Sequence, residues 1–98
     1  MKSSIKQLLE LGQIPADSDM SDELFEKYDK LLQFNQPLFE DEAEQLVRLF
    51  SPDCDGLNWA LLRAIESAGC SKEKLMELAE KCPNPEYAEM LRNRAENR

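Results

Sequence analysis

The sequence contains no histidine, the side chain that most often moves protons near neutral pH. Its absence excludes the Cys–His and Ser–His pairs that activate a nucleophile, and it removes the commonest protein ligand of zinc. A glycine-rich phosphate-binding loop and other catalytic motifs are also missing. We therefore expect no enzymatic activity and no bound cofactor or metal ion.

Cysteine is scarce, and long apolar runs are absent. The chain has three cysteines, Cys54, Cys70 and Cys82. Because their number is odd and their spacing is not that of a disulfide framework, we expect reduced thiols. No apolar run approaches the ~20 residues that a membrane-spanning helix needs. The first residues, MKSSIKQLLELGQ, lack the apolar centre and the cleavage site of a signal peptide. The expected location is the cytoplasm.

The remaining composition is typical of a globular protein, with 42% hydrophobic and 33% charged residues in a chain of 98. A chain of this length forms one domain, which here spans residues 1–98. Apolar residues recur at helical spacing, and no stretch alternates with the period of a strand. The sequence predicts an all-α fold, a compact bundle of about six short helices in antiparallel or right-angled pairs.

Capping residues and helix breakers place the predicted helices. Gly12 ends a short first helix, and Gly69 ends the fourth. Ser21 and Ser71 are predicted N-caps, and Asn84 is a third, followed by a proline in the first helical position. The second predicted helix covers about residues 22–33, the third extends from near residue 39 to residue 50, and the fourth covers about residues 57–68.

The apolar residues of the predicted helix 57–68 wrap most of its circumference, which is typical of a buried central helix. A core position is expected for Trp59 in this helix and for Tyr87 in the last helix; the alternative is that either one is an exposed anchor for a partner protein. The inward-facing stripes of the second and third helices include Phe25 and Phe39.

One stretch, SPDCDGLNWALL, looks at first like a calcium loop; it begins at Ser51 and ends at Leu62. In an EF-hand alignment Asp53, Asp55 and Gly56 occupy loop positions three, five and six. Ser51 and Leu62 then stand at the positions that require acidic ligands. The EF-hand reading is therefore rejected.

Cys54 offers no better site, because no second cysteine lies near enough for a metal or redox pair. Capping chemistry accounts for the same residues. Ser51 fits a helix N-cap, with Pro52 in the first turn of the helix. Asp53 or Asp55 fits the N-cap of a second possible helix start. We interpret this stretch as the beginning of a helix.

The net charge of −8 is concentrated in one segment. Residues 17–44 contain ten acidic side chains against Lys27 and Lys30, a balance of −8. Residues 1–16 carry +1 and residues 45–98 carry −1. Phosphates need cationic partners, so the charge argues against nucleic acid and against anionic membrane surfaces. A basic protein is the expected partner.

Within this segment Asp22, Glu26 and Asp29 fall at i, i+4 and i+7, on one face of the predicted second helix. Two interpretations remain open: an ordinary solubilising surface, or an electrostatic landing face for a basic protein. The predicted contact residues add the acids at the start of the third helix to this face: Asp22, Glu26, Asp29, Glu40, Asp41 and Glu44.

Residues 49–68, LFSPDCDGLNWALLRAIESA, run from a helix ending in Leu-Phe through an Asp/Cys/Gly turn into Leu-x-Trp-x-Leu-Leu. This segment resembles small all-α bacterial immunity proteins of contact-dependent inhibition and other polymorphic toxin systems. The resemblance implies a cytosolic protein that neutralises a basic toxin domain, such as a nuclease, by covering its active site. The alternative function is a helical scaffold or adaptor that binds a partner protein in an apolar groove.

Overall fold

The computed structural model describes residues 3–34 and 36–97. These residues contain six α-helices and two short 3-10 helices, and they form no strand. The all-α prediction is confirmed. None of the described helices has both the length and the apolar character required to cross a membrane. The elements are α1 (Ser3–Leu11), η1 (Asp17–Asp19), α2 (Asp22–Leu31), α3 (Glu40–Leu46), η2 (Val47–Leu49), α4 (Asp55–Glu66), α5 (Lys72–Lys81) and α6 (Pro85–Glu96).

The predicted caps form as expected. The side-chain oxygens of Ser21, Ser71 and Asn84 each accept hydrogen bonds from backbone N–H groups in the first turn of the helix that follows. Gly12 and Gly69 have φ angles of 80° and 61°, the left-handed conformation that lets the chain leave a helix sharply. These five local signals each mark one end of a helix: the ends of α1 and α4, and the starts of α2, α5 and α6.

Helix α3 begins at Glu40, close to its predicted start near Phe39, whereas α4 begins earlier than predicted. Helix α4 starts at Asp55, about two residues early, and ends at Glu66. Helix α3 follows Phe39, whose backbone N–H donates to the carboxylate of Glu42 over 2.9 Å. Glu42 is only 2% exposed, so this acid of the 17–44 segment serves the helix start rather than the surface.

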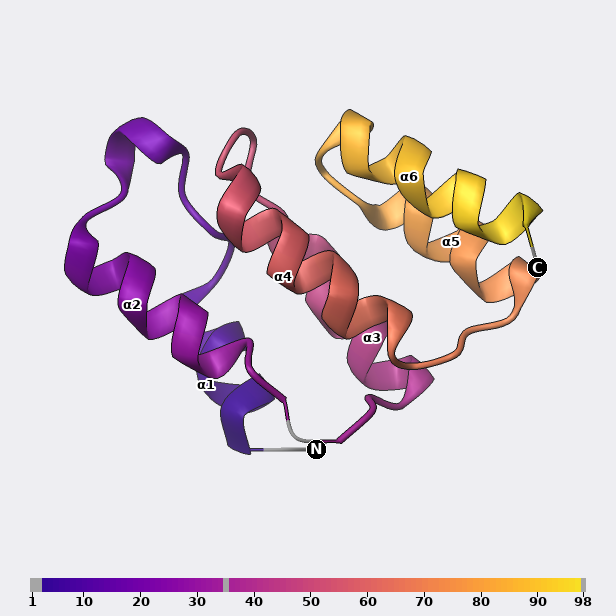
Figure 1. Ribbon diagram of the computed structural model, residues 1–98, viewed down its shortest axis with the longest axis horizontal. Helices are drawn as coiled ribbons and strands as arrows, with labels where there is room; N and C mark the ends of the chain where they lie inside the picture. Colours follow the sequence, from indigo (N-terminus) through magenta and orange to yellow (C-terminus); the bar gives the residue numbers. More distant parts are fainter. Residues whose placement is uncertain (1–2, 35, 98) are drawn as a thin grey trace.

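The helices pack as three successive pairs, α1/α2, α3/α4 and α5/α6, along the long axis of a molecule measuring 37 × 26 × 17 Å (Figure 1). Helices α2, α4 and α6 form the front layer of this view, and α1, α3 and α5 lie behind them. Contacts between α1 and α3 and between α2 and α4 join the first two pairs. Helix α4 therefore lies at the centre of the molecule, as predicted.

Helix α4 is nevertheless covered on only part of its circumference. The prediction that Trp59 is buried is wrong, because 43% of this residue is exposed, whereas Tyr87 is buried as expected. The tryptophan lies edge-on against Tyr87, with the ring centroids 6.0 Å apart. Gly56, Trp59 and Arg63, at i, i+3 and i+7, form an outward stripe on this front-layer helix. The core-facing residues of α4 are Leu57, Asn58, Leu61, Leu62, Ala64 and Ile65.

Two phenylalanines predicted to face inward are also exposed. Phe39 is 70% exposed because it stands at the N-cap, outside the helical periodicity that placed it in an apolar stripe. Phe25 is 37% exposed at the edge of the α2 stripe. It lies over Gly56, whose missing side chain leaves the ring without a cover.

A buried polar network joins the three helix pairs at Ser51, which is fully buried. Its hydroxyl donates to the carbonyl of Pro15 over 2.8 Å and accepts from the backbone N–H of Cys54 over 3.0 Å. Its backbone N–H donates to the Asn58 side chain over 2.8 Å, and the amide of Asn58 returns a bond to the Ser51 carbonyl over 3.0 Å. The amide of Asn84 donates to the same carbonyl over 2.8 Å.

The SPDCDGLNWALL stretch is thus a helix start, and Ser51 caps the turn that precedes it. The aspartates act otherwise than predicted, since α4 has Cys54 at its N-cap and no side-chain cap. The carboxylate of Asp53 instead accepts the backbone N–H of Asp17 over 2.7 Å. The same network holds the loop after α1, the start of α4 and the start of α6 in place.

We predict that Asn58→Ala destabilises the protein more than any exposed substitution of comparable size. Two hydrogen bonds to buried backbone groups of Ser51 are lost, which should lower the free energy of unfolding by about 2–4 kcal/mol. Urea unfolding followed by circular dichroism measures the change. The exposed Asn93 provides the control, and its replacement by alanine should stay within about 0.5 kcal/mol of the wild type. Equal midpoints for the two variants would contradict the structural role of the network.

Candidate protein-binding surface

Helix α2 presents one acidic face to solvent, formed by Asp22, Glu26 and Asp29. Asp22 and Glu26 are exposed, and Asp29 is partly exposed. The opposite side of the helix is fixed by Tyr28, which is 1% exposed. Its hydroxyl donates to the carbonyl of Gly12 over 2.9 Å, which ties α2 to the end of α1. The rotation of α2 about its axis, and with it the direction of the acidic face, is set by this anchor.

No cation among the described residues pairs with the acidic face of α2. Among the residues that the structure describes, none of its three carboxylates takes part in an ion pair. Asp29 accepts a hydrogen bond of 3.4 Å from the neutral side chain of Gln33. Lys27 and Lys30 of the same helix form no ion pair with a described acid. The negative charge is therefore open to an incoming partner.

The other predicted contact residues lie on α3, behind α4 in the view of Figure 1. Glu40 and Asp41 are exposed in the first turn of that helix. Glu44 is paired instead with Lys81, and its second oxygen lies 3.4 Å from Lys74. The structure thus brings three of the six predicted residues onto one open face and places the other three on a helix of the rear layer.

The ion pairs of Glu44 connect α3 to α5. The hydrogen bond from Lys81, helped by the charge of Lys74, lowers the pKa of the Glu44 carboxyl from 4.5 to about 2. Lys81 also lies 3.1 Å from Glu77, and these bonds raise its own pKa. Glu44 has a structural use in this position, and its charge is already balanced by neighbouring cations.

One exposed aromatic ring, that of Phe25, lies beside the acidic face of α2, and a second, that of Trp59, lies on the neighbouring helix α4. Phe25 lies between Asp22 and Asp29 along the helix, and its ring is 3.8 Å from the point where a Cβ atom on Gly56 would stand. Trp59 follows Gly56 by one turn on the outward stripe of α4. We call the line along which α2 meets this stripe the α2–α4 seam. The seam was not predicted from the sequence. The signal that could have indicated it is Gly56 in the first turn of α4, because a residue without a side chain leaves room for a neighbouring ring.

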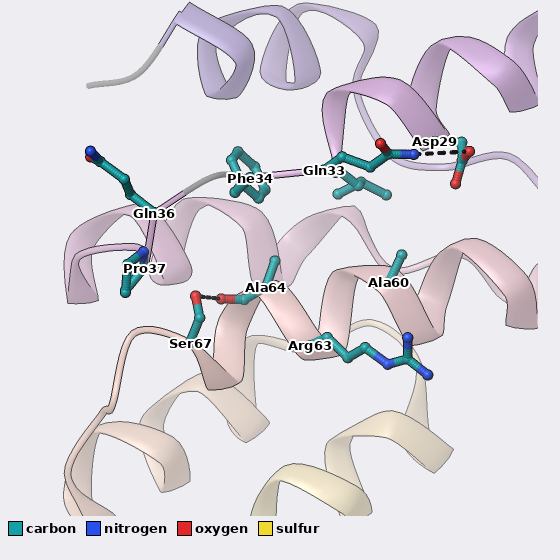
Figure 2. Close-up of a pocket in the computed structure, with 10 residues that line it drawn as sticks. Asp29, Gln33, Phe34, Gln36, Pro37, Ala60, Arg63, Ala64 and Ser67 are labelled. Carbon is teal, nitrogen blue, oxygen red and sulfur yellow. Dashed lines mark hydrogen bonds between the residues drawn. The ribbon is translucent and has the colours of Figure 1, made fainter.

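A hollow of about 480 Å³ continues the seam toward the end of α2 (Figure 2). Asp29 and Gln33, joined by their hydrogen bond, lie on its α2 side, and Arg63 lies on its α4 side. Apolar and polar side chains contribute equally to the lining of the hollow, a mixture that also occurs at protein interfaces. Its lining residues are Asp29, Leu32, Gln33, Phe34, Gln36, Pro37, Ala60, Arg63, Ala64 and Ser67.

No disulfide joins Cys54, Cys70 and Cys82. Burial raises the pKa of the Cys54 thiol and of the Cys82 thiol, so both favour the protonated and less reactive form. In residues 3–34 and 36–97, no three cysteine, aspartate or glutamate side chains gather closely enough to hold a metal ion. The exposed surface of α2 and α4 is accordingly the better candidate site.

Comparison of the chain with protein-family models, with curated proteins and with solved structures gave no match. The functional argument therefore depends on the geometry and charge of the described surface.

We predict that the contribution of Glu44 to stability disappears in acid. Because its folded-state pKa is lowered, the contribution is present above pH 4.5 and is lost as the pH falls toward about 2. Glu44→Gln should therefore be less stable than the wild type at pH 7, and the two should converge near pH 2. Urea unfolding at a series of pH values measures the difference.

The matched control is Glu80→Gln on α5, an exposed acid that forms no ion pair with a described residue. Its unfolding curve should follow that of the wild type throughout. A difference between wild type and Glu44→Gln that stays constant from pH 7 to pH 2 would show that the ion pairs are not its source.

Proposed function

We propose that this protein binds a basic protein partner through the acidic face of α2, and that it acts as an immunity protein against a basic toxin domain. The observation that carries the proposal is the open charge of Asp22, Glu26 and Asp29, which no described residue neutralises. The resemblance of residues 49–68 to bacterial immunity proteins points to the same class.

The electrostatic argument compares two acidic sites of the same protein. Glu44 is balanced by Lys74 and Lys81, whereas the carboxylates of the acidic face of α2 pair with no cation among the described residues. Asp22 and Glu26 stand at i, i+4, where like charges cost a helix about 0.2–0.5 kcal/mol. A concentration of like charge on one face attracts a basic protein over a distance, speeds association and rejects acidic competitors. Unbalanced charge of this kind suits a binding face.

A nuclease is the toxin class that fits this face best. The active-site groove of a nuclease must hold a phosphate backbone, so it is lined with lysines and arginines. The acids of α2 repeat every three or four residues, which is about 4.5–6 Å along the helix axis. A row of anions at this spacing can occupy a groove built for a row of phosphates. The toxin would be neutralised because its substrate no longer reaches the active site.

The second candidate function is a helical adaptor that binds its partner mainly through apolar contacts. The exposure of Phe25 on α2 and of Trp59 on α4, together with the 480 Å³ hollow, favours it. Ionic strength separates the two functions. Binding by open charge weakens as salt screens the acids, whereas binding by apolar contact responds little.

We predict that reversing the charge of the acidic face abolishes partner capture. The variant Asp22→Lys/Glu26→Lys/Asp29→Lys should lose more than tenfold in affinity, because three attractive interactions become repulsive. Wild-type and variant proteins are immobilised and exposed to lysate of the cells that produce the protein, at about 0.05 M and about 0.5 M salt. A basic protein should be retained by the wild type at low salt and released at high salt.

The matched control reverses three exposed acids on α5 and α6, in the variant Glu73→Lys/Glu80→Lys/Glu96→Lys. It makes the same change in net charge and should still retain the partner. Expressed alone, the partner should arrest cell growth, and co-expression of the wild type should restore it. Equal capture by all three proteins would refute the acidic-face proposal, and a captured partner without toxicity would refute the immunity role.

A further inference from the structure

We infer that the α2–α4 seam is a docking surface for a cationic amphipathic helix of the partner, with its apolar side against Phe25 and Trp59. The lysines and arginines of that helix would face the acidic face of α2. This inference depends on the proposed function, since it describes how the same basic partner is held. It adds an apolar component that the charge argument does not contain.

The apolar component comes from two aromatic side chains that the fold leaves uncovered. Phe25 is 37% exposed and lies against Gly56 of the outward stripe of α4, and Trp59, which is 43% exposed, is a member of that stripe. The ring of Trp59 packs edge-on against the buried ring of Tyr87, with the ring centroids 6.0 Å apart. A tryptophan held in this way loses little rotamer freedom on binding, and tryptophan is prominent among the residues that dominate interface energies.

The length of the seam fits a short helix. Between Gly56 and Ser67, α4 advances about 16 Å, which equals the length of about three helical turns. An amphipathic helix of that length presents apolar anchors at i, i+3 or i+4, and i+7. One anchor would lie against Phe25 and Trp59, and a later one would enter the hollow lined by Ala60, Ala64 and Phe34.

The charges around the seam specify the occupant. The acidic face of α2, which extends from Asp22 to Asp29, borders one side of the seam. A second copy of this protein, with a net charge of −8, would bring acids against acids. Arg63 lies on the α4 side of the hollow, so the cations of the occupant belong on the α2 side. A cationic helix with one apolar face meets both requirements.

The inference is tested with synthetic peptides that contain no tryptophan. The first is an amphipathic helix of lysine and leucine of about 14 residues, close to the minimum length of a stable isolated helix. The second has the same composition with its leucines scattered around the helix, and the third is oligolysine of equal charge. The readout is the fluorescence of Trp59, the single tryptophan of the protein. The amphipathic peptide should bind at least tenfold more tightly than the other two, shift the emission to the blue and protect it from acrylamide.

Two substitutions of equally exposed apolar residues locate the contact. Phe25→Ser should weaken binding of the amphipathic peptide about tenfold, the loss expected when one buried aromatic anchor is removed. Met76 on α5 is 38% exposed, close to the 37% of Phe25, and Met76→Ser should bind as the wild type does. Circular dichroism establishes that each variant is folded. If Phe25→Ser does not fold, the emission and quenching of Trp59 in the wild type decide.

Equal affinity for all three peptides, with the Trp59 emission unchanged, would overturn the docking inference and leave the acidic-face proposal intact. Binding of none of the peptides would also overturn it, because the occupant would then need features beyond a cationic amphipathic helix. Undiminished binding by the α2 charge-reversal variant would overturn the pairing of cations with the acidic face. The partner capture described above decides the proposed function separately.

Discussion

The hydrogen bonds around Ser51 hold this small protein in one arrangement. One serine, fully buried, connects the loop after α1, the beginning of α4 and the beginning of α6, so all three helix pairs meet at it. Its partners Asn58 and Asn84 satisfy backbone groups that would otherwise be buried without hydrogen bonds. The network fixes where α4 starts, and with it the position of Gly56 against Phe25 of α2 and the exposure of Trp59 on the outward stripe.

The acidic side chains of this protein differ in whether neighbouring groups bind them. Glu42 is folded into the start of α3, and Glu44 is balanced by two lysines of α5. The acidic face of α2 has no such partner among the described residues, Phe25 is exposed on the same helix, and Trp59 is exposed on the neighbouring α4. Charge for attraction and aromatic area for close contact are thereby placed side by side, which is how protein interfaces are usually composed.

The parts of this structure that depend on neighbouring residues could be predicted from the sequence. Caps at Ser21, Ser71 and Asn84 are local, and so is the common face of Asp22, Glu26 and Asp29, because each follows from the geometry of a single helix. Contacts between distant segments could not be predicted. Glu44 meets Lys81 across 37 positions of the chain, and the exposure of Trp59 depends on which helices flank α4. Periodicity identifies an apolar residue without showing whether a neighbouring helix covers it.

The most direct test of the binding surface is a map of amide chemical shifts in the ¹⁵N-labelled protein during titration with the amphipathic lysine–leucine peptide. Our account predicts that the largest changes fall in residues 22–34 and 56–67, the two sides of the α2–α4 seam. Small changes are expected in α5, whose ion pairs with Glu44 lie in the rear layer. Changes concentrated in residues 72–81, or spread evenly over the surface, would contradict it.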